Sequence, residues 1–408
     1  MSQFNKSKIS KTMFKPSKTA RYFMNITEFC YWLGLPDIWI RDNSRPRLIS
    51  RIHDIYTNLA VVLIGALLIL EWGAFFTQPN LTERQASIRV LFGISHPFLY
   101  AFILNILFYE EKIRVFLHKL VVELKEVYND EEIEKAMVRK MKVYSTSFMA
   151  FFYTAIFFYG ADALVNVTRN GATFTTVVAA WPEVQDKSPL ADVFRGFFYV
   201  VFLMFMQLLC GVYTTVITMT ICLSHQYKNL QSYFHNLRRI FDENVSQRQK
   251  EAKYLDGFKL GVTLHAKTLW CRQEWQSICN ILFSLQVILN VIVLILTLSQ
   301  MATAGKTLFA LVSTLFTLIS ILSSTGLFML NAGDVTVEAF RIPMAMYHSG
   351  WHHCLSAPEI RKLVVCAMRQ GQKPEVLWAL GIVPMSYESY VSIVKSSYTI
   401  FSVLYSQN

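Results

Sequence analysis

The residues best suited to chemistry in this 408-residue chain form a polar stripe within its last apolar segment. They recur at intervals of three and four, which places them on one face of an α-helix. A lysine at the centre of a membrane helix costs about 2.5–3.5 kcal/mol, so we expect the stripe to face water. The alternative is a buried helix whose hydroxyls bond to their own backbone. The stripe comprises Glu388, Ser392, Lys395, Thr399, Ser402 and Ser406, and the predicted pore-lining residues are Lys395, Thr399, Ser402 and Ser406. One helix cannot enclose a pore, so several copies around an axis are expected.

Catalytic and metal chemistry find little support. His348, His352, His353 and Cys354 form a cluster, but their spacing fits no closed zinc site. The chain has no phosphate-binding loop, no Cys-x-x-Cys pair and no Gly-x-Ser-x-Gly elbow. We therefore expect no catalytic residue, metal or cofactor, and we do not interpret the chain as an enzyme.

A binding site for a small apolar ligand is a stronger possibility. Two apolar segments are dense in aromatic residues and methionine, and a few polar residues in neighbouring segments could orient a ligand. Lipid contact or simple packing is the alternative explanation for the aromatic residues. The candidate ligand-binding residues are Phe92, His96, Tyr153, Phe157, Phe198, Phe202, Met206 and Thr314.

The elements that must position these residues are membrane spans. The chain is 53% hydrophobic and only 16% charged, against about 25% charged in soluble proteins, which excludes ordinary soluble, disordered and disulfide-scaffold classes. Seven segments are long enough to cross a bilayer, although Glu388 and Lys395 interrupt the last. They are Thr57–Thr77, Ser87–Phe108, Val143–Val165, Phe194–Leu223, Trp275–Ser299, Thr307–Leu330 and Ser386–Tyr405.

The distribution of charge predicts the orientation. The N-terminal segment and the loops after spans two, four and six hold 32 of the 39 Lys and Arg residues and 21 of the 28 acidic residues. The whole net charge of +11 therefore lies on one side, which the positive-inside rule assigns to the cytoplasm. Basic residues there flank the spans and suit anionic membrane lipid, whereas nucleic acid is not an expected partner. The predicted fold is an all-α membrane protein with seven transmembrane helices, a cytoplasmic N-terminus and an extracellular C-terminus.

Two other sequence features agree with this orientation. Glycosylation sequons at Asn80 and Asn166 fall in predicted outer loops, and Asn80 is the predicted glycosylation site. Those at Asn25 and Asn244 fall inside and should be silent. None of the seven cysteines lies in an outer loop, so we expect no outer disulfide.

The long inner loops carry helical periodicity, which predicts long helices extending into the cytoplasm. One apolar stripe continues span two, a second follows span four, and a third leads into span five. Ser356 and Glu359 form a capping box before a fourth stripe. The stripes include Ile113, Phe116, Leu117, Leu120 and Leu124; Leu230, Tyr233, Phe234 and Leu237; Tyr254, Leu255, Phe258 and Val262; and Ile360, Leu363, Val364 and Ala367.

The C-terminal quarter resembles the insect odorant receptor family. Residues 331–351, from Asn331-Ala-Gly-Asp to Tyr347-His-Ser-Gly-Trp351, are similar to the family's segment before its last helix. Residues 370–404 follow the same pattern through Gln-Lys-Pro at 372–374, Met-Ser-Tyr at 385–387 and Ser-Tyr-Thr at 397–399, where the family usually has Ser-Tyr-Ser. The Met-Ser-Tyr-Glu form at 385–388 is most similar to moth receptors, including their pheromone branch.

The resemblance implies a ligand-binding subunit of an odorant-gated, non-selective cation channel in the plasma membrane of olfactory sensory neurons. Family members form heterotetramers with a shared odorant coreceptor (Orco). The last helix lines the pore, cytoplasmic helices form the anchor, and a small volatile odorant or pheromone binds in the outer halves of spans two, three, four and six. A gustatory-type receptor of the same architecture and a G-protein-coupled receptor remain alternatives, although the charge distribution opposes the latter.

These features divide the chain into four regions. Residues 1–56 form a cytoplasmic N-terminal segment, and residues 57–330 form a six-helix ligand-binding region with cytoplasmic extensions. Residues 331–385 form a cytoplasmic anchor segment. Residues 386–408 form the pore-lining helix and an extracellular tail.

Overall fold

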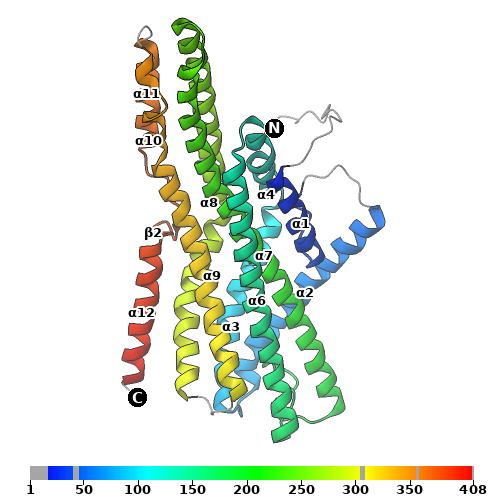
Figure 1. Ribbon diagram of the computed structural model, residues 1–408. Helices are drawn as coiled ribbons and strands as arrows, with labels where there is room; N and C mark the ends of the chain where they lie inside the picture. The colour runs from blue at the N-terminus through cyan, green and yellow to red at the C-terminus, as the bar shows by residue number, and fades with distance from the viewer. Residues whose placement is uncertain (1–16, 40–45, 304–307, 355–357, 407–408) are drawn as a thin grey trace.

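The computed structural model describes residues 17–39, 46–303, 308–354 and 358–406. Long, roughly parallel helices make up almost all of it (Figure 1). The membrane-length helices are α2 (Arg47–Thr77), α3 (Glu83–Phe108), α6 (Glu131–Asn170), α7 (Pro189–Asn236), α8 (Gln247–Thr303) and α9 (Leu308–Phe340). The shorter elements are α1 (Lys18–Trp32), α4 (Glu110–His118), the π-helix η1 (Lys119–Glu123), α5 (Leu124–Val127), the 3-10 helices η2 (Leu237–Asp242) and η3 (Trp351–His353), α10 (Ile342–Tyr347), α11 (Pro358–Gly371), the strands β1 (Trp378–Ala379) and β2 (Val383–Pro384), and α12 (Tyr387–Ser406).

The seven-span prediction is confirmed in outline. Among the described residues, six helices are long and apolar enough to cross a membrane. The seventh, α12, has 20 residues, or about 30 Å of helix, and packs beside α8 and α9 (Figure 1). The polar stripe makes α12 less apolar than the other six helices.

Helix α7 is the centre of the bundle. It contacts α6, α8 and α9, and 78% of its most apolar window is buried, against 17% for α6. An apolar helix surrounded by other helices buries nearly every face, whereas α6 keeps one face for its surroundings. The core is therefore built around α7.

The predicted cytoplasmic extensions are present. Helices α7 and α8 continue without interruption beyond their apolar stretches, and their stripe residues Leu230, Phe234, Tyr254 and Phe258 are buried. The capping serine Ser356 lies outside the described residues, but α11 begins at Pro358 and buries Ile360 and Val364.

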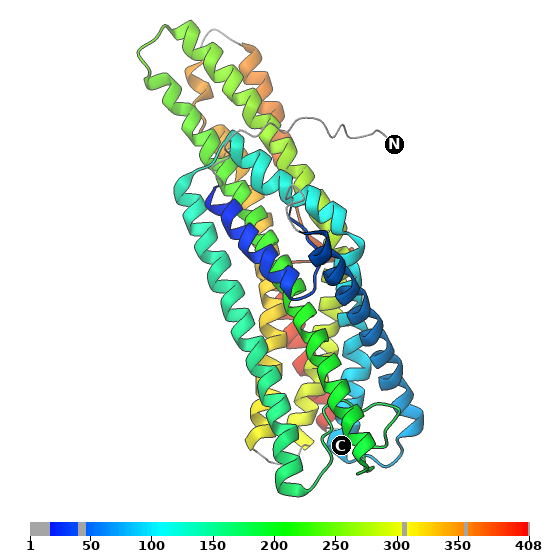
Figure 2. The same ribbon diagram turned by 90° about the vertical axis from the view of Figure 1, so that its right-hand side faces the viewer.

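The extension after span two departs from the prediction. Helix α3 ends at Phe108, and Tyr109, at φ −96° and ψ 13°, separates it from α4. The following segment crosses the bundle obliquely (Figure 2). The stripe residues Ile113, Phe116 and Leu120 are fully buried, because this change of direction turns them onto α7 and α8.

Helix α1 was not predicted. The sequence predicts only a polar cytoplasmic segment for residues 1–56, yet Lys18–Trp32 forms a helix that packs against α6 and α7. Thr19 donates from its backbone nitrogen and its hydroxyl to Glu134 Oε1, at 2.8 and 2.7 Å. The buried positions Thr19, Phe23, Thr27 and Cys30 have helical spacing, so the signal was present in the sequence.

The turn between α5 and α6 is tied to α7. Asp130 caps α6 by accepting from the backbone nitrogens of Glu132 and Ile133. Ser232 on α7 donates to Asp130 at 2.5 Å, and this hydrogen bond holds the pKa of the Asp130 carboxyl below its ordinary value. The side chain of Asn229 accepts from the Asp130 backbone and donates to the Tyr128 carbonyl. These contacts fix the start of α6.

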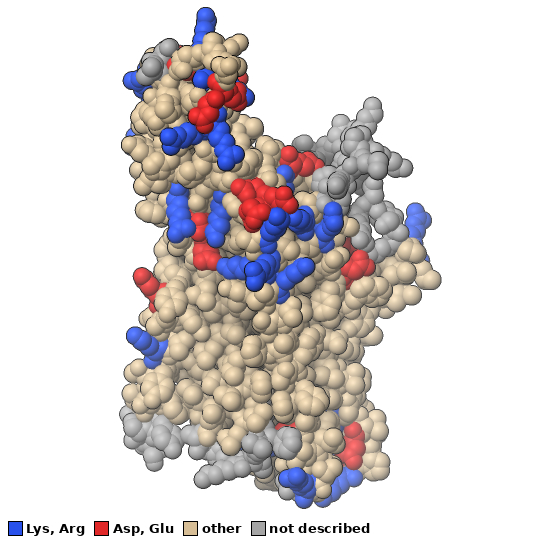
Figure 3. Space-filling model, viewed as in Figure 1, with Lys and Arg blue, Asp and Glu red and all other residues tan. Residues whose placement is uncertain are grey.

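Charged side chains gather toward the two ends of the molecule. Figure 3 shows a broad band nearly free of charge between them, with most Lys and Arg residues at the end that carries α4, α10 and α11. The C-terminal end of α12 lies at the opposite end (Figure 1). This separation agrees with the charge partition seen in the sequence.

The junction between α4, α7 and α8 provides a test of this packing. Trp275 is fully buried, stacks on Phe116 at 4.9 Å, and donates through Nε1 to the Thr220 hydroxyl at 2.9 Å. Trp275→Ala should lower the free energy of unfolding by about 3–5 kcal/mol, measured as a lower melting temperature of the purified receptor in detergent. Trp32→Ala removes the same side chain from a 66% exposed position and should change the melting temperature little. Equal losses for the two variants would contradict this packing.

Candidate ligand-binding site

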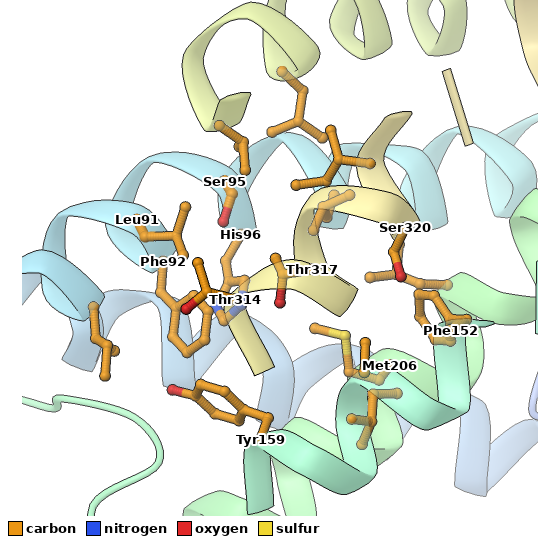
Figure 4. Close-up of a pocket in the computed structure, with 18 of the residues that line it drawn as sticks. Leu91, Phe92, Ser95, His96, Phe152, Tyr159, Met206, Thr314, Thr317 and Ser320 are labelled. Atoms are coloured by element: carbon orange, nitrogen blue, oxygen red, sulfur yellow. The ribbon is translucent and has the colours of Figure 1, made fainter. Parts of the chain in front are cut away.

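A cavity of about 230 Å³ lies among α3, α6, α7, α8 and α9. Figure 4 shows labelled side chains of α3, α6, α7 and α9 that line it. Its wall is mainly apolar and aromatic, with a small number of polar groups, which is typical of small-molecule sites. The wall includes Leu91, Phe92, Ser95, His96, Phe152, Ala155, Tyr159, Phe202, Met206, Thr314, Thr317 and Ser320.

Five of the eight candidate ligand-binding residues line this cavity. They come from α3, α7 and α9 and are Phe92, His96, Phe202, Met206 and Thr314. The other three do not line it. Tyr153 and Phe157 lie on α6 and are 37% and 68% exposed, and Phe198 is buried one turn away from Phe202, against Phe194.

The geometry of α6 explains the two exposed residues. Its cavity-facing positions include Phe148, Phe152, Ile156 and Tyr159, which follow the helical repeat of 3.6 residues. Tyr153 and Phe157 each come one position after a cavity residue and are therefore turned about 100° away. Aromatic density identified the helix but not its inward face.

His96 and Glu71 form a buried hydrogen-bonded pair that the sequence did not predict. Its Nδ1 lies 2.8 and 2.9 Å from the two carboxylate oxygens of Glu71 on α2. The side chains of His96 and Glu71 are only 1% and 2% exposed. Phe92 stacks on the imidazole at 4.3 Å, and Phe205 meets it edge-on at 5.2 Å. Glu71 sits inside the predicted first span, and an ionisable residue at such a position is itself a signal of function.

A hydrogen-bonded network forms the inner end of the cavity. Tyr213 on α7 donates to Gln286 Oε1 at 2.7 Å. The amide of Gln286, on α8, donates to the hydroxyls of Thr325 at 2.8 Å and Ser324 at 3.3 Å, both on α9. Tyr213, Gln286 and Ser324 also line the cavity, so three helices meet at its wall through paired polar groups.

Charged and polar groups close over the other end. Arg84 on α3 pairs with Asp162 on α6, and both line the cavity. The connection between α6 and α7 packs beside them, and Tyr159 donates to its Thr176 carbonyl. The Gln78 amide also donates to carbonyls of this connection, at Ala179 and Pro182, at 3.1 and 3.0 Å. These hydrogen bonds hold the connection between α6 and α7 beside this end of the cavity.

The polar stripe of α12 lies away from this cavity. Lys395, Thr399 and Ser402 are exposed, and a shallow groove of this chain contains Lys395 and Thr399. Ser402 lies outside that groove, and the side chain of Ser406 is outside the described residues. The opposite side of α12 packs on its neighbours through buried Ser397 and through Tyr390, whose hydroxyl donates to the Leu322 carbonyl of α9 at 3.1 Å. Thr399 donates to the Lys395 carbonyl, as the alternative of self-bonded hydroxyls requires.

The two candidate outer sequons differ in local structure. Asn80 is exposed in the short connection before α3, and Thr82 of its sequon caps that helix. Asn166 lies within the last turns of α6, and its amide donates to the Asp162 carbonyl at 2.8 Å. The connection before α3 is the more accessible of the two. All seven cysteines are free thiols.

Comparisons with known proteins identify the family. A family model described as 7tm Odorant receptor matches residues 100–398. The fold is similar to that of the insect olfactory receptor OR5 from Machilis hrabei, with a TM-score of 0.77 and 14% identity, covering 95% of this chain and 98% of that one. The same receptor in complex with eugenol matches with a TM-score of 0.78, 14% identity and the same coverage. No curated protein matches the chain. The resemblance seen in residues 331–404 is thereby confirmed, and this chain, a multi-pass membrane protein, belongs to the 7tm odorant receptor family.

Proposed function

We propose that this chain is the odorant-binding subunit of an odorant-gated, non-selective cation channel in the plasma membrane of olfactory sensory neurons. The observation that carries the proposal is the separation of two features on one chain. A mainly apolar cavity lies among the helices of the bundle, and an exposed polar stripe runs along α12. The first suits a small ligand, and the second suits a water-filled path shared with other subunits.

The ligand is a neutral, volatile, mainly hydrocarbon molecule with one oxygen function. Phe92, Phe202 and Met206 offer apolar surface, and each square ångström removed from water contributes about 25 cal/mol. Two charged groups at the cavity, Arg84 and Asp162, are already paired with each other. A charged or sugar ligand would need partners that this wall does not offer. The similar receptor solved with eugenol is consistent with a ligand of this kind.

The membrane orientation follows from charge. The end that carries α4, α10 and α11 holds most Lys and Arg residues (Figure 3), so it faces the cytoplasm by the positive-inside rule. The C-terminal end of α12 is then extracellular. This is the reverse of a G-protein-coupled receptor.

The pore is shared with the odorant coreceptor (Orco). A homotetramer would place four copies of Lys395 around one axis, and these charges would repel permeating cations. Partner subunits without this lysine relieve that repulsion. The heterotetramer is therefore the conducting form, with Thr399, Ser402 and Ser406 beside the conduction path.

Ligand binding reaches the pore through α9. The network of Tyr213, Gln286 and Thr325 joins the cavity wall to α9, and Tyr390 joins α9 to α12. A ligand shifts the balance between closed and open pores only by binding one of them more tightly. Packing of α9 on α12 transmits that preference without contact between odorant and pore.

The cavity can be tested by shortening one wall residue. Phe202→Ala should shift the odorant dose–response by about tenfold or more, because it removes a large apolar contact. Phe197→Ala on the same helix changes a 45% exposed side chain outside the cavity and should leave the response unchanged. Currents are recorded from cells expressing the chain with and without the coreceptor, using a panel of neutral volatiles, charged molecules and sugars. Responses confined to charged or sugar ligands, or robust currents from the chain alone, would refute the proposal.

The pore stripe can be tested at Ser402. Ser402→Leu should alter single-channel conductance, ion selectivity or open probability, because it replaces a hydroxyl on the polar stripe with a bulky apolar group. Val403→Leu enlarges the adjacent exposed residue off the stripe and serves as the control. Unchanged conductance and selectivity in Ser402→Leu at normal surface levels would remove this face of α12 from the pore.

The orientation can be tested at the sequons. Asn80→Gln should abolish the shift in gel mobility that an N-glycosidase produces, since Asn80 is exposed on the proposed outer side. Asn166→Gln, within a helix, should leave the shift in place. A C-terminal epitope should be stained on intact cells. Loss of the shift in Asn166→Gln alone, or an epitope seen only after permeabilisation, would contradict the assignment.

A further inference from the structure

One face of α6 is exposed along almost its whole length. Only 17% of the most apolar window of α6 is buried, the lowest fraction among the six membrane-length helices of the described chain. A set of exposed residues recurs on it at intervals of three, four or seven positions, which places them on one stripe of the helix. This exposed stripe of α6 consists of Lys135, Arg139, Lys142, Thr146, Ala150, Tyr153, Phe157 and Leu164.

The stripe changes from basic to apolar at the start of the predicted third span. Arg139 and Lys142 come before residue 143, where that span begins, and Tyr153 and Phe157 lie within it. At about 1.5 Å per residue, Lys142 and Tyr153 are about 16 Å apart along the helix axis, close to half of a bilayer core of about 30 Å. Figure 3 shows Lys and Arg side chains gathered along the border of the band nearly free of charge. A phospholipid in one leaflet has the same order, with a charged headgroup above apolar chains.

The two cations at this border are not engaged in ion pairs within the part of the chain that the structure describes. Lys135, further along the stripe, already lies 2.7 Å from Glu132 and 3.6 Å from Glu131. Lys140, on the neighbouring side of α6, pairs with Asp334 of α9 at 2.5 Å. Arg139 and Lys142, here called the basic pair, are exposed and have no such acidic partner. Their charged groups are therefore available to an anion.

The neighbouring helices leave the basic pair uncovered. Helix α1 packs along one side of α6, where the Thr19 hydroxyl donates to Glu134 and the Tyr22 hydroxyl lies 3.2 Å from that of Ser145. Helix α9 packs on another side and also contacts α12, and Figure 1 shows it between α6 and α12. In the proposed channel, the polar stripe of α12 faces the other subunits. The exposed stripe of α6 therefore faces membrane lipid.

We propose that the basic pair binds the headgroup phosphate of an anionic phospholipid in the cytoplasmic leaflet, and that the acyl chains of this lipid lie along the exposed stripe of α6. The inference rests on the proposed orientation, which places this end of α6 at the leaflet that is rich in anionic lipid. A guanidinium can donate two parallel hydrogen bonds to a phosphate, and an ammonium adds a compact positive charge. Thr146 and Ala150 have small side chains, so acyl chains can lie against the helix between Lys142 and Tyr153.

The test measures how a short-chain lipid stabilises the receptor complex, purified in detergent through a fluorescent tag on this chain. A ligand that binds the folded state raises its melting temperature, so dioctanoyl phosphatidylserine is titrated and the melting temperature is read from the tag. Arg139→Gln combined with Lys142→Gln should raise the concentration needed for half-maximal stabilisation by about tenfold or more, because each cation near an anionic headgroup adds to the affinity. Dioctanoyl phosphatidylcholine, which has no net charge, should act equally on the wild type and on this variant.

Matched variants separate the site from a general effect of charge. Arg361→Gln combined with Lys362→Gln removes two exposed cations from α11, which lies far from the apolar band (Figure 1), and should titrate like the wild type. Arg139→Lys combined with Lys142→Arg keeps both charges and should largely restore the wild-type titration. Lys142→Gln alone should give a smaller loss than the double variant. The melting temperature without lipid checks that each variant is folded.

Every outcome decides the assignment. Equal titrations of the wild type and the double glutamine variant of α6, or an equal loss in the α11 variant, would overturn it. Glycerophosphoserine, the headgroup without acyl chains, should stabilise the complex only at concentrations at least about tenfold higher, because it lacks the apolar contact. Stabilisation by glycerophosphoserine as strong as that by the lipid would assign the basic pair to a soluble phosphate compound instead. These measurements involve no odorant, so their failure leaves the odorant-binding proposal standing.

Discussion

A polar group inside the hydrocarbon of a membrane must find its partner within the protein, and this constraint organises the bundle. Water is absent there, so each unpaired group costs several kcal/mol. Glu71 pairs with His96, Gln286 with Tyr213 and Thr325, and Asn105 donates to the Ile278 carbonyl. Each pair joins two different helices. The polar residues of the interior therefore define which helices are neighbours, while the apolar residues supply the area that holds them together.

The same constraint determines where the polar and apolar parts of the cavity wall lie. Three of its walls are tied together by Tyr213, Gln286 and Thr325, and its other end is covered by the ion pair of Arg84 and Asp162. The space between these polar ends is lined by aromatic side chains whose ring edges and faces contact one another, as Phe92 does with Phe202 and Tyr159. A wall of rigid rings between fixed ends holds a definite shape without a ligand. A preorganised site of this kind loses little entropy when a ligand enters.

The sequence predicted where the helices lie better than it predicted which side of each helix faces the interior. Apolar length located six spans, and the stripe with Glu388 and Lys395 distinguished the last helix, since both signals depend only on local composition and period. The break at Tyr109 was missed because it serves the burial of Phe116 against Trp275, a contact 159 positions apart in the chain. Phe157 was placed at the cavity because aromatic residues facing lipid and residues facing a ligand have the same composition. Glu71 was visible in its span, but its partner His96 lies on another helix, and only the fold brings them together.

Because the cavity and the polar stripe of α12 are separate, a ligand in the cavity can affect the stripe only indirectly. In the proposed function, an odorant bound among α3, α6, α7, α8 and α9 lies away from the exposed face of α12, so its influence on that face depends on an element that touches both. Helix α9 does so: Ser324 lines the cavity, and Leu322 accepts from Tyr390 of α12 within the same turn. Gly326 is one turn further on, and a Cβ there would lie 3.3 Å from the Tyr390 ring, so the glycine allows Tyr390 to approach α9 closely. The proposed gating uses this contact: a ligand-induced displacement of α9 would pass to α12 through close packing, since packed interiors shift between discrete arrangements and do not deform continuously.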